Sequence, residues 1–434
     1  MQPLPPSKEV EKSRPDLPEK RFEIRESILT KVYKIQHVKS VQNLAISAFI
    51  LLAIRNAIND IYYGGQSELG LRWIRMAFGK FPLAIAMWIL MFGAHVAFYF
   101  GWKIWYKFRT PMDTMKSLWD VIWLSVFFVA LFGTFHMVAK KAIQLELPMG
   151  SFAAVLAEQT RFLMKNYAFV RTSSEQVLTG KKSSTFRSFL YFSFAPTLIY
   201  RNEYPRTPTR SWRTVGKYFM ELILSVYFLS LLETEIIQHL YNFGTKPFTL
   251  IDIVYTLATF SVHSFIFATI LAQISLHSSQ NTFAEITRFG DRQFHKDWWT
   301  STNLSEFYTT WNVIVQDWLF YYVYRDFYKY VTIGNKMTAR LSVFMLSIVM
   351  HEVLFIYVTK LMCPVFSLSM LISLPLMIVR NTNRKFNLLM MLQCMLGNSI
   401  LLMFPNMEFF AKINCPTRPA STPFYIPYLY SCHR

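Results

Sequence analysis

The sequence predicts an all-α fold, a polytopic transmembrane bundle of about nine helices. Hydrophobic residues make up 53% of the 434 residues and charged residues only 16%, against roughly 25% charged residues in soluble domains. Apolar runs of about 20 residues recur along the chain, and each is long enough to cross a bilayer. Few soluble folds could bury so many long apolar runs, so we expect a multi-pass membrane protein.

Nine segments are candidate spans. The segment 148–171 is the least apolar of them, since it contains Glu158, Gln159, Arg161 and Lys165. The basic stretch that follows it should lie in the cytosol, which requires this segment to cross with its polar side chains turned into the bundle. The nine segments are 41–58, 82–105, 118–138, 148–171, 214–240, 250–278, 338–360, 364–380 and 387–405.

These spans divide the chain into three parts. We expect residues 1–40 to be cytosolic, with 21–40 forming a short surface helix, residues 41–405 to form the membrane domain, and residues 406–434 to be a lumenal tail. The apolar run within 304–330 could form a tenth span, but we interpret it as helices at the interface or buried in the protein. Cys415 and Cys432 then lie in an oxidising lumen, where a disulfide between them would persist.

The net charge of +19 does not indicate nucleic-acid binding. The positive residues lie between apolar spans, as expected for cytosolic loops of a membrane protein. The histidines and cysteines also lack metal-ligand spacing, so neither a metal nor another cofactor is predicted.

Four histidines fall in candidate spans: His95, His136, His263 and His351. An ionisable residue in a span is by default a functional hypothesis. His351 has the most suggestive surroundings, because Ser347 lies one helical turn before it on the same face. An imidazole in this apolar stretch would be desolvated and mostly neutral, as a general base must be. The alternative is a packed histidine bonded to a neighbouring carbonyl.

A second cluster runs from Trp298 through Asn312 to Trp318. Asn312 is an amide among apolar residues and can donate and accept hydrogen bonds at once. If residues 312–330 form one helix, Asn312 and Gln316 lie four residues apart on one face. The tryptophans could instead be an interfacial aromatic belt.

Five stretches resemble the sterol O-acyltransferases of the membrane-bound O-acyltransferase family. The resemblance extends from about residue 22 to the end and implies the fold of that family. The stretches are FGKFP (78–82), LYFSFAPTLIYRNEYPRTPT (190–209), NTFAEITRFGDRQFHKDWW (281–299), FYTTWNVIVQDWLFYYVYRDF (307–327) and SIVMHEV (347–353).

The resemblance implies roles for individual residues. His351 matches the catalytic histidine and Asn312 the asparagine of the WN motif, while Tyr324 and Lys336 match positions that touch acyl-CoA. Four further residues are expected to position the substrates. Three positions depart from the family pattern and leave the choice of substrate open. The positioning residues are Trp298, Trp311, Gln316 and Ser347; the departures are His295 for Tyr, Thr300 for Asn, and Gln316 for His.

The resemblance further implies acyl transfer from a long-chain acyl-CoA to a sterol hydroxyl in the endoplasmic reticulum membrane, by a homo-oligomer (dimer or tetramer). His351 would take the hydroxyl proton, and Asn312 could orient the thioester or donate to the oxyanion. Basic groups such as Arg325 and Lys336 suit the CoA phosphates. Two alternatives remain: acylation of another lipid alcohol, such as diacylglycerol or a long-chain alcohol, and a non-catalytic lipid-binding membrane protein.

Overall fold

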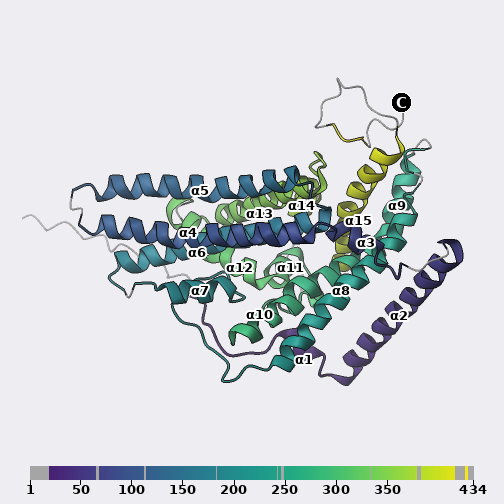
Figure 1. Cartoon of the computed structure of the whole chain (residues 1–434), viewed down its shortest axis with the longest axis horizontal. Helices are drawn as coiled ribbons and strands as arrows, with labels where there is room; N and C mark the ends of the chain where they lie inside the picture. The colour runs from purple at the N-terminus through teal and green to yellow at the C-terminus, as the bar shows by residue number, and fades with distance from the viewer. Residues whose placement is uncertain are drawn as a thin grey trace, which may run out of the picture.

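The fold is a bundle of long helices joined by loops, and we describe it from a computed structural model (Figure 1). Two isolated backbone bridges tie loop segments together, Arg25 with Asp291 and Arg206 with Phe289. The structure describes residues 19–64, 68–111, 114–181, 183–241, 243–245, 249–332, 334–378, 383–415 and 426–428.

Three long helices form one wall of the molecule: α4 (Phe81–Arg109), α5 (Lys116–Gln144) and α6 (Met149–Leu178). They lie side by side and pack pairwise against one another (Figure 1). Pro82 occupies the first turn of α4, where its missing N–H breaks no helical bond. Their facing side chains form the main hydrophobic core, so this wall is a rigid base for the loops that follow.

A second group of helices packs around a smaller apolar core. α9 and α15 lie together at the other end of the molecule and α8 crosses toward them (Figure 1). α2 is set apart at the edge, and its Phe49 stacks on Phe228 of α8 with ring centroids 4.5 Å apart. The group comprises α2 (Gln36–Gly64), α3 (Arg72–Phe78), α8 (Trp212–Gln238), α9 (Leu250–Ala272), η1 (Gln273–Ser278), α10 (Ser279–Thr287) and α15 (Lys385–Asn414).

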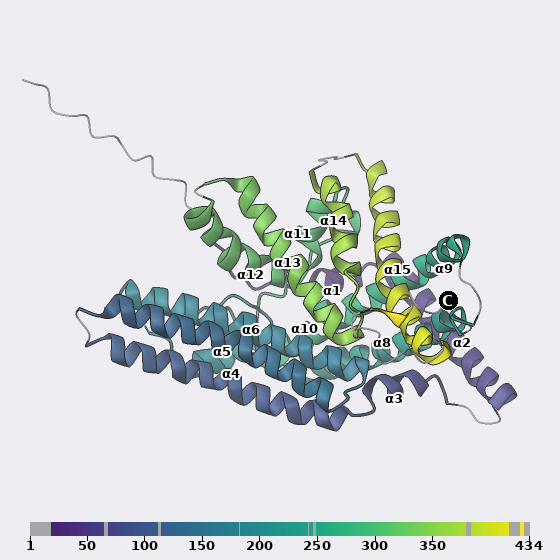
Figure 2. The same ribbon diagram turned by 90° about the horizontal axis from the view of Figure 1, so that it is seen from above.

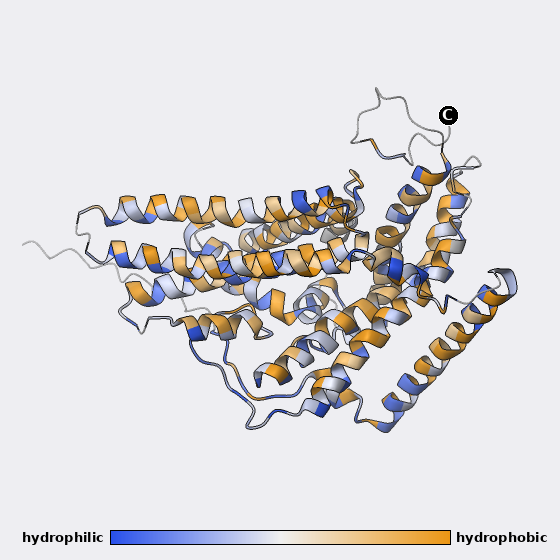
Figure 3. Ribbon diagram, viewed as in Figure 1, coloured by the Kyte–Doolittle hydropathy of each residue, from blue (hydrophilic) through white to orange (hydrophobic). Residues whose placement is uncertain are grey.

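In the described part of the chain, seven helical segments are long and apolar enough to cross a membrane. Apolar residues predominate along these helices (Figure 3), and many of their large apolar side chains are exposed, as lipid contact requires. The prediction of a multi-pass helical membrane protein is therefore confirmed. The other two predicted spans also form helices: α6 is too polar to count by composition, and α14 (Val365–Ile378) is too short to count by length.

The polar side chains of α6 do turn into the protein, as the sequence predicted. Lys165 is 1% exposed and Gln159 is 5% exposed, while Glu158 is paired with Arg161 at 2.5 Å. The Lys165 ammonium donates to the carbonyl oxygens of Phe192 and Ala195. These carbonyls close the C-terminus of α7 (Phe186–Phe194), where a cation satisfies acceptors that have no helical donor.

The run 304–330 forms four short helical pieces instead of a tenth span. The pieces are α11 (Leu304–Trp311), α12 (Val313–Leu319), η3 (Phe320–Tyr324) and η4 (Phe327–Val331), of which the last two are π-helical. Two of them contact α6: the Trp318 indole of α12 donates to the Met164 carbonyl at 2.9 Å, and the Tyr322 hydroxyl of η3 lies 2.9 Å from that of Thr172. The run is thus helical and partly buried, in line with the interpretation of helices at the interface or buried in the protein.

Residues 313–331 form an unbroken helical run through α12, η3 and η4, as considered for residues 312–330, but Asn312 itself lies just outside this run. Asn312 has φ −134° and ψ 86° and is the N-cap of α12, so the helix begins at Val313. The physical reason is local: the Asn312 side chain accepts the Val315 N–H, and this bond competes with continuous helix. Asn312 is therefore the N-cap of α12, and Gln316 lies in the first turn of that helix.

Residues 19–27 form an extended segment, here called the strap, before the one-turn helix α1 (Ile28–Val32). The surface helix expected over residues 21–40 is therefore not observed. Arg25 pairs with Asp291 and exchanges backbone hydrogen bonds with Gly290 and Arg292. Phe22 packs edge-on against Phe289. The strap therefore fixes the loop after α10.

Candidate active site

Three helices meet around the candidate catalytic residues: α11, α14 and α13 (Lys336–Thr359). Figure 2 shows them side by side, above the wall of α4, α5 and α6. Tyr308 of α11 joins the three, because its hydroxyl donates to the Met370 sulfur at 3.1 Å and its ring lies 6.0 Å from that of Phe344. Asn312 directly follows α11 and His351 lies on α13, so both residues belong to this group.

His351 is exposed on α13. Its Nδ1 lies 2.7 Å from the Ser347 carbonyl oxygen and 3.4 Å from the Ser347 hydroxyl. A carbonyl oxygen only accepts, so Nδ1 carries the proton and Nε2 of the neutral ring holds the lone pair. Protein atoms do not desolvate this imidazole as the sequence led us to expect. Any such desolvation comes from lipid or substrate.

The other three candidate histidines have different surroundings. His95 is 1% exposed and stacks between Phe162 and Phe189, so it serves as packing. His263 makes the same bond to the carbonyl four residues earlier, at 3.0 Å, but lies on α9 among the second group of helices. His136 of α5 lies 3.4 Å from the Tyr357 hydroxyl of α13.

The side-chain oxygen of Asn312 forms a hydrogen bond within the protein. Oδ1 accepts from Val315 N at 3.1 Å, and the Asn312 carbonyl accepts from Gln316 N at 3.0 Å. The Nδ2 amide group has no partner among the described residues. The cap therefore fixes the side chain and leaves a donor pair for a substrate oxygen.

Trp298 and Trp311 form an aromatic cluster beside Asn312. Their ring centroids lie 4.6 Å apart at 72°, and Phe307 stacks on Trp311 at 5.4 Å. Trp298 is 8% exposed, so it belongs to the protein interior and not to an aromatic belt facing lipid headgroups. The Asn387 amide of α15 holds the following loop by donating to the carbonyls of Trp299 and Ser301.

The two residues expected to touch acyl-CoA lie on neighbouring elements. Tyr324 of η3 stacks between Phe320 and Tyr328, at 5.5 and 5.9 Å. Lys336 is exposed at the first position of α13, which packs against η3. A rise of about 1.5 Å per residue places Lys336 about 22 Å from His351 along the helix. An elongated thioester can span such a separation.

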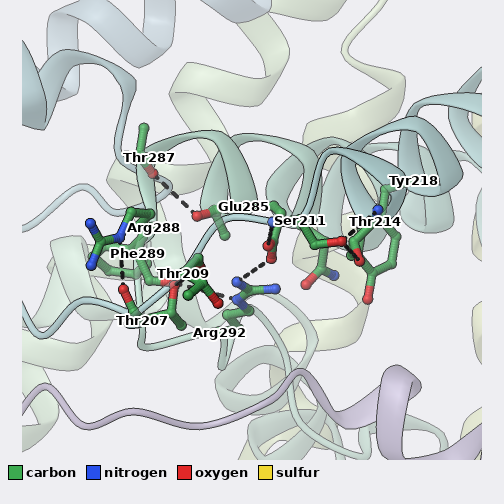
Figure 4. Close-up of polar contacts among 12 residues, drawn as sticks. Thr207, Thr209, Ser211, Thr214, Tyr218, Glu285, Thr287, Arg288, Phe289 and Arg292 are labelled. Atoms are coloured by element: carbon green, nitrogen blue, oxygen red, sulfur yellow. Dashed lines mark hydrogen bonds and ion pairs between the residues drawn. The ribbon is translucent and has the colours of Figure 1, made fainter.

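The loops before α8 and after α10 are joined by a network of charged and backbone contacts (Figure 4). Glu285 accepts from the Ser211 N–H at 2.8 Å and from Arg292 at 2.6 Å. Arg288, with φ 58°, donates to the Thr207 carbonyl at 2.7 Å. This network fixes the segment that leads to Trp298.

A cleft of about 260 Å³ lies between the strap and α12, lined among others by Lys296, Val313 and Tyr321. Lys20 of the strap pairs with Asp317 across it. Burial raises the pKa of the Asp317 carboxyl, while the charge of Lys20 acts to lower it. The strap therefore neutralises a carboxylate on the helix that Asn312 caps.

Two of the three residues that depart from the family pattern donate hydrogen bonds to nearby backbone carbonyls. His295 is buried, its Nδ1–H donates to the Lys296 carbonyl at 3.0 Å, and burial lowers its pKa. The Thr300 hydroxyl donates to the Asp297 carbonyl at 2.7 Å. Gln316 is half-buried on α12.

The predicted disulfide cannot be placed in full, because Cys432 lies outside the described residues; Cys415 ends α15. Cys363 and Cys394 are not disulfide-bonded. Within the described ranges, no group of three or more His, Cys, Asp or Glu residues could hold a metal ion.

Two residues beside His351 were not predicted from the sequence to act in the site. Glu352 accepts the Ser367 N–H at 2.5 Å, and Phe366 lies parallel to the His351 ring at 4.9 Å. Glu352 directly follows His351 in the sequence, and this adjacency could have indicated that it belongs to the site. Phe366 gave no such indication, because it reaches His351 only through the turn between α13 and α14.

Comparisons with known proteins agree with this architecture. The family model of the membrane-bound O-acyltransferases matches residues 112–404. The chain is 32% identical over 432 residues to sterol O-acyltransferase 1 of Chlorocebus aethiops, covering 95% of this chain and 78% of the relative. It is 31% identical over 447 residues to sterol O-acyltransferase 2 of Homo sapiens, covering 99% and 84%.

The structure is a multi-pass helical bundle, the architecture expected of a membrane-embedded protein. Since the family match covers well over half of the chain, the protein belongs to the membrane-bound O-acyltransferase family. It is an O-acyltransferase.

Proposed function

We propose that this enzyme transfers an acyl group from a long-chain acyl-CoA to a sterol hydroxyl in the endoplasmic reticulum membrane. The observation that carries the proposal is the His351 geometry: Nδ1–H donates to the Ser347 carbonyl, which leaves Nε2 to accept a proton. The relatives named sterol O-acyltransferase support the choice of acceptor.

In this reaction His351 Nε2 removes the proton of the acceptor hydroxyl as its oxygen attacks the thioester carbonyl. The carbon–sulfur bond then breaks, and CoA leaves as a thiol after taking up a proton. Asn312 Nδ2 is suited to donate to the developing oxyanion, because its Oδ1 is already held by Val315. Trp298, Trp311, Gln316 and Ser347 position the two substrates.

Acyl-CoA is polyanionic at one end and apolar at the other. We place its phosphates near Tyr324, Arg325 and Lys336, where basic side chains can pair with them. The acyl chain and the sterol are apolar and reach His351 from the bilayer. No cofactor is needed, since the thioester is already activated, and we expect a homo-oligomer.

The test is an acceptor panel in microsomes from cells without sterol-esterifying activity. Labelled oleoyl-CoA is supplied with cholesterol, diacylglycerol or a long-chain alcohol, and the labelled esters are separated. The proposal expects the sterol to be the preferred acceptor. Esterification of diacylglycerol or the alcohol without sterol ester would refute the sterol assignment, and no ester at all would favour a lipid-binding protein.

A further inference from the structure

The ring of Phe366 lies flat against the imidazole of His351. The two rings are 4.9 Å apart between centroids and 3° from parallel. Parallel contact restricts rotation of the imidazole about its χ2 bond, since turning the ring edge-on would drive it into the phenyl face. The hydrogen bond from Nδ1 to the Ser347 carbonyl fixes one point of the ring, and Phe366 fixes its plane.

Phe366 is in turn held by the N-terminus of α14. Ser367 donates its backbone N–H to Glu352 Oε2 at 2.5 Å, so a carboxylate on α13 occupies the positive end of α14. Val365, on the other side, is 4% exposed in the second hydrophobic core. Phe366 therefore cannot shift without breaking a contact on either side.

Glu352 accepts a hydrogen bond from a backbone N–H group of α14 and not from a charged side chain. Glu352 is 8% exposed, and its second oxygen, Oε1, is buried without a partner in the described part of the chain. Leaving a buried carboxylate oxygen unpaired is unfavourable, so this arrangement is expected to persist only where it has a use. Fixing the residue that stacks on His351 is such a use.

We propose that Phe366 is a positioning residue for the acyl-transfer reaction, acting through His351. Its ring holds the imidazole in the rotamer that keeps Nδ1–H on the Ser347 carbonyl and Nε2 toward the acceptor. This inference rests on the proposed role of His351. It predicts that loss of the planar contact lowers kcat, because fewer molecules hold the base in the reactive geometry, while substrate binding is unaffected.

The experiment compares variants of the full-length enzyme in microsomes. Phe366→Leu removes the ring plane, and Phe366→Met does so with a different shape should the leucine variant fail to fold. We expect kcat to fall about tenfold with KM for acyl-CoA and acceptor within about twofold. Phe366→Tyr keeps the plane and should restore kcat. A phenylalanine outside the stack, Phe355, packs on the second core and is the matched control: Phe355→Leu should leave kcat near wild type.

Combination with His351→Ala separates the two claims. If Phe366 acts through His351, Phe366→Leu has no further effect on the residual rate of His351→Ala. Wild-type activity of His351→Ala would overturn the proposed base. Loss of activity in His351→Ala, together with wild-type kcat in both Phe366→Leu and Phe366→Met, would overturn the positioning role alone. Equal losses in Phe366→Tyr and Phe366→Leu would also overturn it.

Discussion

At the scale of single residues, the site depends on side chains that are fixed by the backbone near them. His351 is bonded to the carbonyl four residues earlier, and Asn312 caps the helix that follows it. Each thus keeps one polar atom in the fold and leaves the other for chemistry. This division makes it possible to separate structural from catalytic effects by mutation.

Two substitutions of Asn312 separate its effect on stability from its effect on activity. Asn312→Ala should abolish acyl transfer and also cost about 1 kcal/mol of stability, since both the donor and the cap are lost. Asn312→Asp keeps an oxygen that can cap, so its thermal stability should stay near wild type while its activity remains lost. Activity assays beside thermal unfolding in detergent measure both effects.

Asn303 provides the control, because it caps α11 in the same way, accepting from Glu306 N at 2.9 Å. Asn303→Ala should lose a comparable amount of stability and keep its kcat. Full activity of Asn312→Asp would mean that the amide donor is not used in the reaction.

Gln316 tests which acceptor the site selects. A glutamine cannot transfer a proton but can form hydrogen bonds, so we expect Gln316 to position substrate. Gln316→His should leave the rate of sterol esterification within roughly tenfold, about 1.4 kcal/mol in barrier. An acceptor panel on both proteins measures this. If only Gln316→His uses sterol, position 316 is the acceptor selector and the wild-type substrate is another alcohol.

At the scale of elements, the N-terminal strap is the least expected feature. Its Arg25 donates two hydrogen bonds to Asp291, at 2.5 and 3.0 Å. The Asp291 side chain is 2% exposed, and this hydrogen bond raises the pKa of Arg25 above its ordinary value. A buried carboxylate without its partner is strongly unfavourable.

Arg25→Ala should therefore destabilise the protein by about 3 kcal/mol, measured as a lower thermal unfolding temperature in detergent. Adding Asp291→Asn to that variant should recover part of the loss, because the uncompensated charge is removed. The exposed pair between Lys34 and Glu26 is the control, and Lys34→Ala should change stability by less than about 1 kcal/mol. Equal losses in the two single variants would show that burial of Asp291 does not matter.

The sequence predicted most helices within a few residues, because long apolar runs set both their existence and their length. The predicted span 250–278 and the observed α9 with η1 have the same bounds. Such patterns do not predict tertiary contacts. The strap, Phe366 and the Glu352 contact each depend on residues brought together only by folding.

For the candidate site, the resemblance named His351, Asn312, Trp298 and Trp311, and in the structure Trp298 and Trp311 pack together beside Asn312 while His351 lies on α13. In the structure the His351 ring is exposed, bonded to the Ser347 carbonyl and stacked on Phe366. Periodicity could not predict this, because a histidine on an apolar helix has the same pattern whether it faces a neighbour or a substrate. The roles of these residues stay predictions.

At the scale of the whole molecule, the orientation in the membrane follows from charge. We expect nine crossings, which would put the basic stretch after α6 in the cytosol and residues 406–434 in the lumen. Two measurements test this topology. The sequon at Asn303 should carry no glycan, because it would lie in the cytosol; a glycan there would contradict the nine-span arrangement.

The second topological measurement concerns Cys415 and Cys432. In an oxidising lumen they should form a disulfide, stabilising the tail by roughly 3 kcal/mol in the chain-entropy model. Thiol labelling of intact, oxidised microsomes should modify neither cysteine until a reductant is added. Labelling of both without reductant would refute the pairing.

The central claim is that His351 is the base of an acyl transfer, and one comparison tests it most directly. Wild type, His351→Ala and His263→Ala are expressed in cells without sterol-esterifying activity, and steryl ester formed from labelled oleoyl-CoA is measured at equal protein level. We predict that His351→Ala lowers turnover by about 10²–10⁴, with folding retained, while His263→Ala stays near wild type. A near-normal rate in His351→Ala together with a loss in His263→Ala would contradict the account.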